Sequence, residues 1–154
     1  MKHFLMSFRF NKQSPQDFGL IYQNGKFYNE KDGAEWKQCV LFDLGWGEEN
    51  GYYKVPLASF EKLMQLVLSD DDIEDSYGAA AMIQKVYPTA LKMYLQTLIC
   101  QKVHFQDRKK LKKLNQFFRL QRGLNLTYIA GMTKDEAEKE NAAWQEIAAF
   151  FSSH

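Results

Sequence analysis

The first third of the chain alternates large apolar residues with other residues at a period of two, the pattern of half-buried β-strands. Every second residue from Phe4 to Phe10 is large and apolar. Comparable runs cover residues 20–29 and 37–57, and polar, turn-forming residues separate the runs. We therefore predict about five strands, mostly antiparallel, in residues 1–57.

Two Asn-Gly pairs mark the expected hairpin turns of this sheet. A type I′ turn needs positive φ at both central residues, and asparagine and glycine tolerate this conformation. The first pair is Asn24-Gly25 and the second is Asn50-Gly51. If both pairs form tight turns, they fix the register of the strands on either side. The expected cross-strand pairs are Tyr22 with Phe27, Ile21 with Tyr28 and Trp46 with Val55.

From residue 59 onward the apolar residues recur with the spacing of α-helices. Ser59 is a good N-cap for the first helix, and Thr133 with Glu136 forms a capping box before the last. Pro88 separates the second helix from the third, because proline disfavours helix at the preceding residue. The expected buried stripe of the second helix is Ile73, Tyr77, Ala80, Ile83 and Tyr87. The five helices are expected at residues 60–68, within 70–87, and at 89–100, 107–122 and 133–151.

A group of strands followed by a group of helices indicates an α+β protein. The length of 154 residues fits one compact domain. We therefore predict a single α+β domain over residues 1–154. Its N-terminal antiparallel sheet lies in residues 1–57, and about five helices in residues 58–154 pack on that sheet.

The composition is that of a globular protein, with 45% hydrophobic residues and a formal net charge of +1. No apolar run approaches the roughly 18 residues that span a bilayer, and the N-terminus lacks the features of a signal peptide. Cys39 and Cys100 lie in apolar runs, which favours two buried, reduced thiols. We therefore expect an intracellular, cytoplasmic protein without a membrane partner.

The sequence contains no common catalytic or cofactor-binding motif. Phosphate-binding and dinucleotide-binding glycine loops, HExxH and GxSxG are all missing, and the three histidines are scattered. Because catalytic sites usually need clustered titratable groups, the sequence favours a non-enzymatic protein with no cofactor and no metal. An enzyme or small-ligand binder with its site between sheet and helices stays an alternative.

The acidic run SDDDIEDSYGAAA is the most unusual segment. Its carboxylates do not fit a calcium loop, because neither register places glycine at position 6 or glutamate at position 12. Carboxylates stabilise the first turn of a helix, but one or two suffice for that. The excess favours binding of a basic partner protein, for example as an immunity- or antitoxin-like protein. The candidate partner-binding residues are Asp70, Asp71, Asp72, Glu74 and Asp75, with Glu48 and Glu49.

A basic helix at residues 108–122 supports an alternative. Cations crowd its start, where the helix dipole disfavours them, so some anion is expected to compensate. Nucleic-acid phosphates are one candidate, and the acidic run of the same chain is another. The candidate nucleic-acid-binding residues are Arg108, Lys109, Lys110, Lys112 and Lys113.

Overall fold

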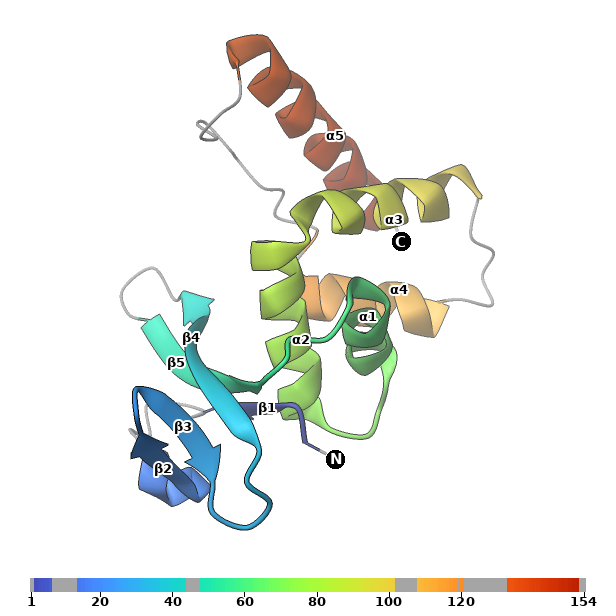
Figure 1. The fold of residues 1–154 in the computed structure, drawn as a ribbon. Helices are drawn as coiled ribbons and strands as arrows, with labels where there is room; N and C mark the ends of the chain where they lie inside the picture. Colours follow the sequence, from blue (N-terminus) through green and yellow to red (C-terminus); the bar gives the residue numbers. More distant parts are fainter. Residues whose placement is uncertain are drawn as a thin grey trace. The chain divides into compact units, whose positions relative to one another are not determined.

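The computed structural model describes residues 2–6, 14–43, 48–101, 108–118, 120 and 133–152. A five-stranded antiparallel sheet precedes five helices, so the predicted α+β class is confirmed (Figure 1). The strand order is β1-β5-β4-β3-β2. The strands are β1 Phe4–Met6, β2 Leu20–Gln23, β3 Lys26–Asn29, β4 Glu35–Asp43 and β5 Glu48–Lys54, and a 3₁₀-helix, η2, covers Pro15–Phe18. The helices are α1 Phe60–Leu68, α2 Ile73–Val86, α3 Pro88–Cys100, α4 Arg108–Phe118 and α5 Lys134–Ser152.

The first Asn-Gly pair forms the predicted turn between β2 and β3. Asn24 has φ of 52° and Gly25 has φ of 79°, as a type I′ turn requires. The cross-strand partners are those expected, Tyr22 with Phe27 and Ile21 with Tyr28. The rings of Tyr22 and Phe27 lie 5.0 Å apart between centroids, so the pair adds packing to the hydrogen-bonded ladder.

The second Asn-Gly pair does not form a turn, and this prediction is wrong. Asn50 and Gly51 lie inside β5, where Asn50 pairs with Val40 and Gly51 with Cys39. β5 is bordered by β4 on one side and β1 on the other, so pairing on both edges overrides the local preference for a turn. The expected opposition of Trp46 and Val55 involves Trp46, which lies outside the described residues. Val55 itself donates its N–H to the carbonyl of Glu35.

The two faces of the sheet are covered differently. On one face, Leu5, Leu20, Trp36 and Tyr52 form a buried cluster. Phe18 of η2 closes this cluster, with its ring 5.9 Å from that of Tyr52. Because successive strand residues point to opposite faces, the neighbouring Phe4 lies on the other face, where α2 packs against it.

The helix boundaries follow the predicted start and stop signals closely. Ser59 accepts a hydrogen bond from the N–H of Lys62, and Thr133 and Glu136 exchange the two bonds of a capping box. α2 ends at Val86 and α3 begins at Pro88. The residues buried on α1, α3, α4 and α5 include Leu63, Met64, Val67, Leu91, Leu95, Leu98, Leu111, Leu114, Phe118, Trp144, Ile147 and Phe151.

The buried face of α2 differs from the predicted stripe. Ala80 and Ile83 are buried as expected, but Ile73 is 58% exposed. Two polar residues, Asp75 and Ser76, are buried in its place. Ile73 lies about 160° around the helix from Asp75, at the first helical residue, so burial of Asp75 leaves it at the surface.

The chain divides into two compact units, residues 1–83 and 84–154, with the boundary inside α2. The change from strands to helices lies at residues 57–59, as predicted. The units carry opposite charge, which the formal total of +1 conceals. The first holds 8 basic and 13 acidic side chains, a net charge of −5, and the second holds 12 and 6, a net charge of +6.

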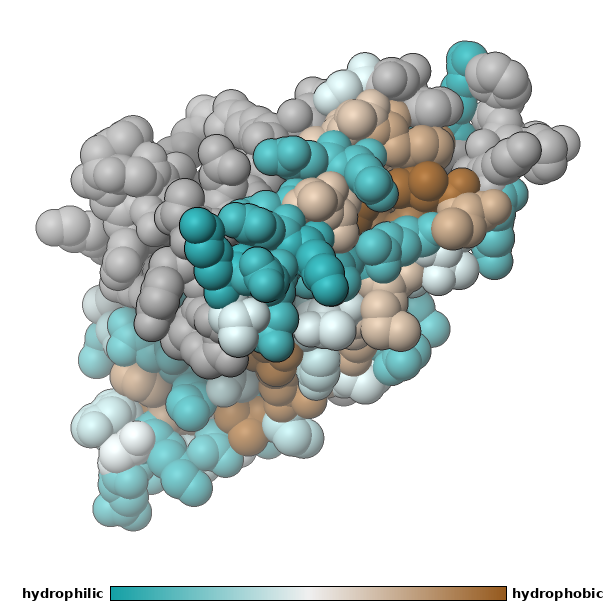
Figure 2. All heavy atoms as spheres, turned by 90° about the horizontal axis from the view of Figure 1, so that it is seen from above, coloured by the Kyte–Doolittle hydropathy of each residue, from teal (hydrophilic) through white to brown (hydrophobic). Residues whose placement is uncertain are grey.

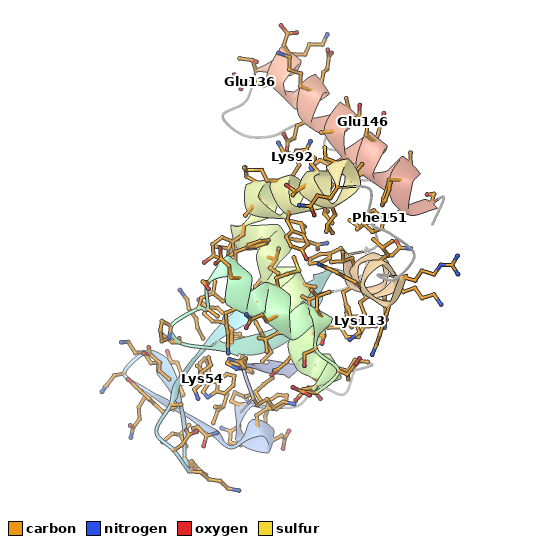
Figure 3. The ribbon with its side chains drawn as sticks, turned by 90° about the vertical axis from the view of Figure 1, so that its right-hand side faces the viewer. Lys54, Lys92, Lys113, Glu136, Glu146 and Phe151 are labelled. Atoms are coloured by element: carbon orange, nitrogen blue, oxygen red, sulfur yellow. The ribbon has the colours of Figure 1, made fainter. Side chains whose placement is uncertain are left out.

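The second unit contains α3, α4 and α5. Lys92 of α3 forms a partly buried ion pair with Glu140 of α5, and the side chain of Lys92 lies against α5 in Figure 3. Gln84 donates a hydrogen bond to the carbonyl of Phe118, at the end of α4. These polar contacts add to the buried apolar residues of the same three helices.

Several surface features bear on the predictions about location. Both cysteines are thiols, Cys39 half-buried and Cys100 exposed, so the prediction that both are buried is wrong. Among the helices that the structure describes, none has the length and apolar character of a bilayer-spanning segment. On the face in Figure 2, hydrophobic side chains form patches bordered by hydrophilic ones. Exposed large apolar side chains include Tyr22, Ile73, Val86 and Met93.

Candidate functional site

The acidic run forms the start of α2, and Asp72 is its N-cap. The Oδ1 atom of Asp72 accepts hydrogen bonds from the N–H groups of Glu74 at 2.9 Å and Asp75 at 3.2 Å. These are two of the donors that a helix start leaves without intrahelical partners. Ser76, one turn on, donates its hydroxyl to the carbonyl of Leu66 near the end of α1, at 2.9 Å. The acidic run therefore caps the start of α2 and ties α2 to the end of α1.

Asp75 binds the backbone of the N-terminal strand. Its carboxylate is buried, at 3% exposure, and accepts from the N–H of His3 at 3.0 Å and of Phe4 at 2.9 Å. β1 is an edge strand, and its outward N–H groups would otherwise lack partners in the sheet. The carbonyl of His3 accepts from Lys54 of β5 on the opposite side of the strand. The Asp75 carboxylate therefore supplies hydrogen-bond acceptors that a neighbouring strand would otherwise provide.

Lys2 binds two further carboxylates of the run. Its ammonium lies 2.8 Å from Oε2 of Glu74 and 3.3 Å from Oδ2 of Asp72. Burial alone would lower the pKa of Lys2, but the hydrogen bond and charge of Glu74, with the charge of Asp72, raise it overall. Burial would likewise raise the pKa of Asp72, but the N–H groups of Asp75 and Glu74 and the charge of Lys2 lower it overall.

The lowered pKa of Asp72 predicts a specific loss of stability in acid. A carboxylate whose pKa is lower in the folded state stabilises the protein above its unfolded pKa, which is near 3.8. That stabilisation is lost as the pH falls through the folded pKa. Asp72→Asn keeps an oxygen for the helix cap and removes the charge. We expect the wild type to exceed this variant in free energy of unfolding at about pH 6, and the difference to shrink as the pH falls below 3.8 and through the lowered pKa of Asp72.

Urea unfolding of both proteins at several pH values measures this difference. Lys2→Met is the companion variant, because it removes the cation and leaves Asp72 and its cap in place. It should reduce the acid-dependent loss without abolishing it, since the two N–H groups remain. A difference between wild type and Asp72→Asn that stays constant with pH would contradict the assignment.

Asp70 and Asp71 are the exposed members of the run. Both precede the helix, and Ser69 accepts a hydrogen bond from the N–H of Asp71. The side chains of Asp72 and Glu74 keep 34% and 30% exposure, so their outer edges reach solvent. We define the acidic surface as Asp70, Asp71, the outer edges of Asp72 and Glu74, and the exposed Ile73 among them.

The other predicted partner-binding residues are Asp75, Glu48 and Glu49. Asp75 lies under the surface with both oxygens accepting from the chain, so it is unavailable to a partner docking on the folded unit. Glu48 and Glu49 lie in β5, opposite Asp43 and Phe42. The exposure of Ile73 is the feature that sequence reasoning missed. The sequence of the helix held no signal for it, because the burial of Asp75 depends on His3 and Phe4, far away in the chain.

The basic helix is α4, in the second unit. Arg108, Lys109 and Lys112 are exposed and Lys113 is half-buried. Lys110 differs, because its ammonium lies over the ring of Tyr94 in α3, 5.4 Å from the centroid. Residues 119 and 122, which the sequence assigned to the same basic segment, lie outside the described residues.

Searches for a metal site and for relatives add no functional assignment. In the described part of the chain, no three His, Cys, Asp or Glu side chains are grouped as metal ligands. Comparison with known protein families, with curated proteins and with solved structures gives no match.

Proposed function

We propose that this protein is a non-enzymatic protein-binding module whose acidic surface takes a basic partner protein. The observation that carries the proposal is the exposure of Ile73 among carboxylates at the start of α2. An apolar centre with a polar rim is the usual anatomy of a protein interface.

The charge of the first unit supports the same proposal. Its net charge of −5 equals the charge of the five carboxylates in the acidic run, because the rest of the unit holds 8 acidic and 8 basic side chains. Negative charge concentrated in one segment accelerates encounter with an oppositely charged partner and penalises partners of like charge. One concrete form is an immunity- or antitoxin-like protein that blocks a basic, nuclease-like toxin in the cytoplasm.

The test begins with affinity capture of the partner from the native host, followed by stopped-flow measurement of binding. Asp70→Asn with Asp71→Asn should slow association about tenfold at low salt and flatten its salt dependence. Both positions are exposed, and urea unfolding checks that the variant folds. The matched control is Asp135→Asn with Glu138→Gln, two exposed acids of α5 that give the same change in net charge.

A second variant tests the apolar centre separately from the charges. Ile73→Ser should leave the association rate near the wild-type value and raise the dissociation rate about tenfold, because a buried anchor mainly holds the complex together. The proposal fails if the doubly neutralised protein and the α5 control bind the captured partner with the same rates and the same salt dependence.

A further inference from the structure

The strongest charged surface that the proposed function leaves unused is the outer side of α4. With 3.6 residues per turn, Arg108, Lys109, Lys112 and Lys113 fall on one side of the helix. The buried residues of α4 are Leu111, Leu114 and Phe118, and they fall on the opposite side. Figure 3 shows α4 nearly end-on, with nitrogen-tipped side chains projecting from it and Lys113 beside them. We call these four cations the basic face.

We propose that the basic face binds the phosphate backbone of a nucleic acid. The surrounding unit carries a net charge of +6, so the field of the whole unit reinforces the four cations. Residues 108 and 112, and 109 and 113, are like-charged neighbours one turn apart, which destabilises an isolated helix. Phosphates bound along this side attract all four cations, and their binding releases counterions, which adds favourable entropy.

The chemistry of the face favours nucleic acid over an acidic protein. Protein interfaces are depleted in lysine and use an apolar or aromatic centre. The exposed residues described on this side of α4 are Arg108, Lys109, Lys112 and Gln116, which are all polar. Three lysines, one arginine and a glutamine form a typical backbone-contacting set, in which glutamine adds neutral hydrogen bonds to phosphate or sugar.

The packing of α4 also argues against an anionic membrane as the ligand. A helix that binds a bilayer surface inserts its apolar side into the lipid. In this protein Leu111, Leu114 and Phe118 are buried within the folded unit. The helix therefore offers charge without the apolar area that membrane binding requires.

The test is fluorescence anisotropy of labelled single-stranded DNA, duplex DNA and duplex RNA, each about 20 nucleotides or base pairs long. Each is titrated with the full chain. We expect binding to at least one of the three at about 50 mM salt, weakening steeply toward about 200 mM. Four phosphate contacts predict a slope of log K against log salt of about −3 to −4. The arm that binds best identifies the kind of nucleic acid.

The variant Arg108→Gln, Lys109→Gln, Lys112→Gln, Lys113→Gln should lose at least about tenfold in affinity and most of the salt slope. The matched control replaces four exposed lysines of the first unit with glutamine, and it should bind as the wild type does. These lysines are Lys26, Lys31, Lys37 and Lys62. Circular dichroism and urea unfolding confirm that both variants fold.

Three results would overturn the proposal. The first is no binding to any of the three nucleic acids at low salt. The second is an equal loss in the control variant, which would assign the effect to net charge. The third is equal or tighter binding to polyglutamate or to vesicles rich in phosphatidylserine. The acidic surface takes no part in these experiments, so their outcome is independent of the proposed protein partner.

Discussion

Asp75→Ala should lower the free energy of unfolding by about 3 kcal/mol, more than a hundredfold in the folding equilibrium. The carboxylate accepts from the N–H groups of His3 and Phe4, and its removal leaves both donors without their acceptor. Each buried donor left unsatisfied costs about 1–3 kcal/mol. The alanine variant also no longer buries a charged carboxylate, and the desolvation free energy that it saves offsets part of this loss.

Two further variants define the origin of the Asp75 effect. Asp75→Asn keeps an oxygen at the position of Oδ1, which serves both donors, and should cost about half as much. Asp71→Ala removes an exposed carboxylate from the same run and should change stability by less than about 0.5 kcal/mol. Urea unfolding gives the energies, and hydrogen exchange at His3 and Phe4 reports the bonds directly. Equal stability of the Asp75→Ala and Asp71→Ala proteins would refute a structural role for Asp75.

Gly78→Ala should destabilise the protein by about 2 kcal/mol, although alanine is the better helix former by about 1 kcal/mol. A Cβ atom at position 78 would lie 2.3 Å from Cγ, 2.6 Å from Cδ1 and 2.7 Å from Cβ of Phe4. Phe4 is 1% exposed, so its ring has no open space to move into. Glycine therefore brings α2 and β1 closer than any other residue permits.

A double-mutant cycle tests that contact. Phe4→Ala removes the ring, and in that background Gly78→Ala should cost less than half of its effect in the wild type. The gain in helix propensity then offsets most of the strain from the remaining Cβ contact. Chemical denaturation of the four proteins measures the coupling. Additive effects of the two substitutions would show that the strain at position 78 arises elsewhere.

The features that the sequence predicted correctly depend on neighbours within a few residues. The turn at Asn24-Gly25 requires only the positive φ that these two residues adopt. The caps at Ser59 and Thr133 need a side chain and a backbone N–H three residues later. Such local chemistry is complete within one segment, so its outcome can be inferred without the fold.

The features that were predicted wrongly depend on segments far apart in the chain. Asn50 and Gly51 have the local signal of a turn, but the strands on both sides of β5 decide their conformation. The buried face of α2 is set by Asp75, whose partners His3 and Phe4 lie 71 or 72 residues away. The residue pattern within α2 does not indicate that His3 and Phe4 are the partners of Asp75.

The candidate site was predicted in part for the same reason. The sequence identified the dense acidic run, but it could not show that Lys2 forms ion pairs with Asp72 and Glu74. It also could not separate Asp70 and Asp71, which are exposed, from Asp75, which is buried. The basic helix was easier to interpret, because its apolar and cationic residues already alternate with the period of a helix.

The attachment of β1 to α2 has a consequence for the order in which the chain folds. The partners of β1 lie in β5, 45 to 49 residues later, and at the start of α2, 71 residues later, so β1 leaves the ribosome well before they do. At about 5–20 residues per second, the strand waits several seconds for its neighbours. Closing so long a loop raises the contact order and slows folding. The N–H groups of His3 and Phe4 therefore meet their acceptor, Asp75, only after the start of α2 has been synthesised.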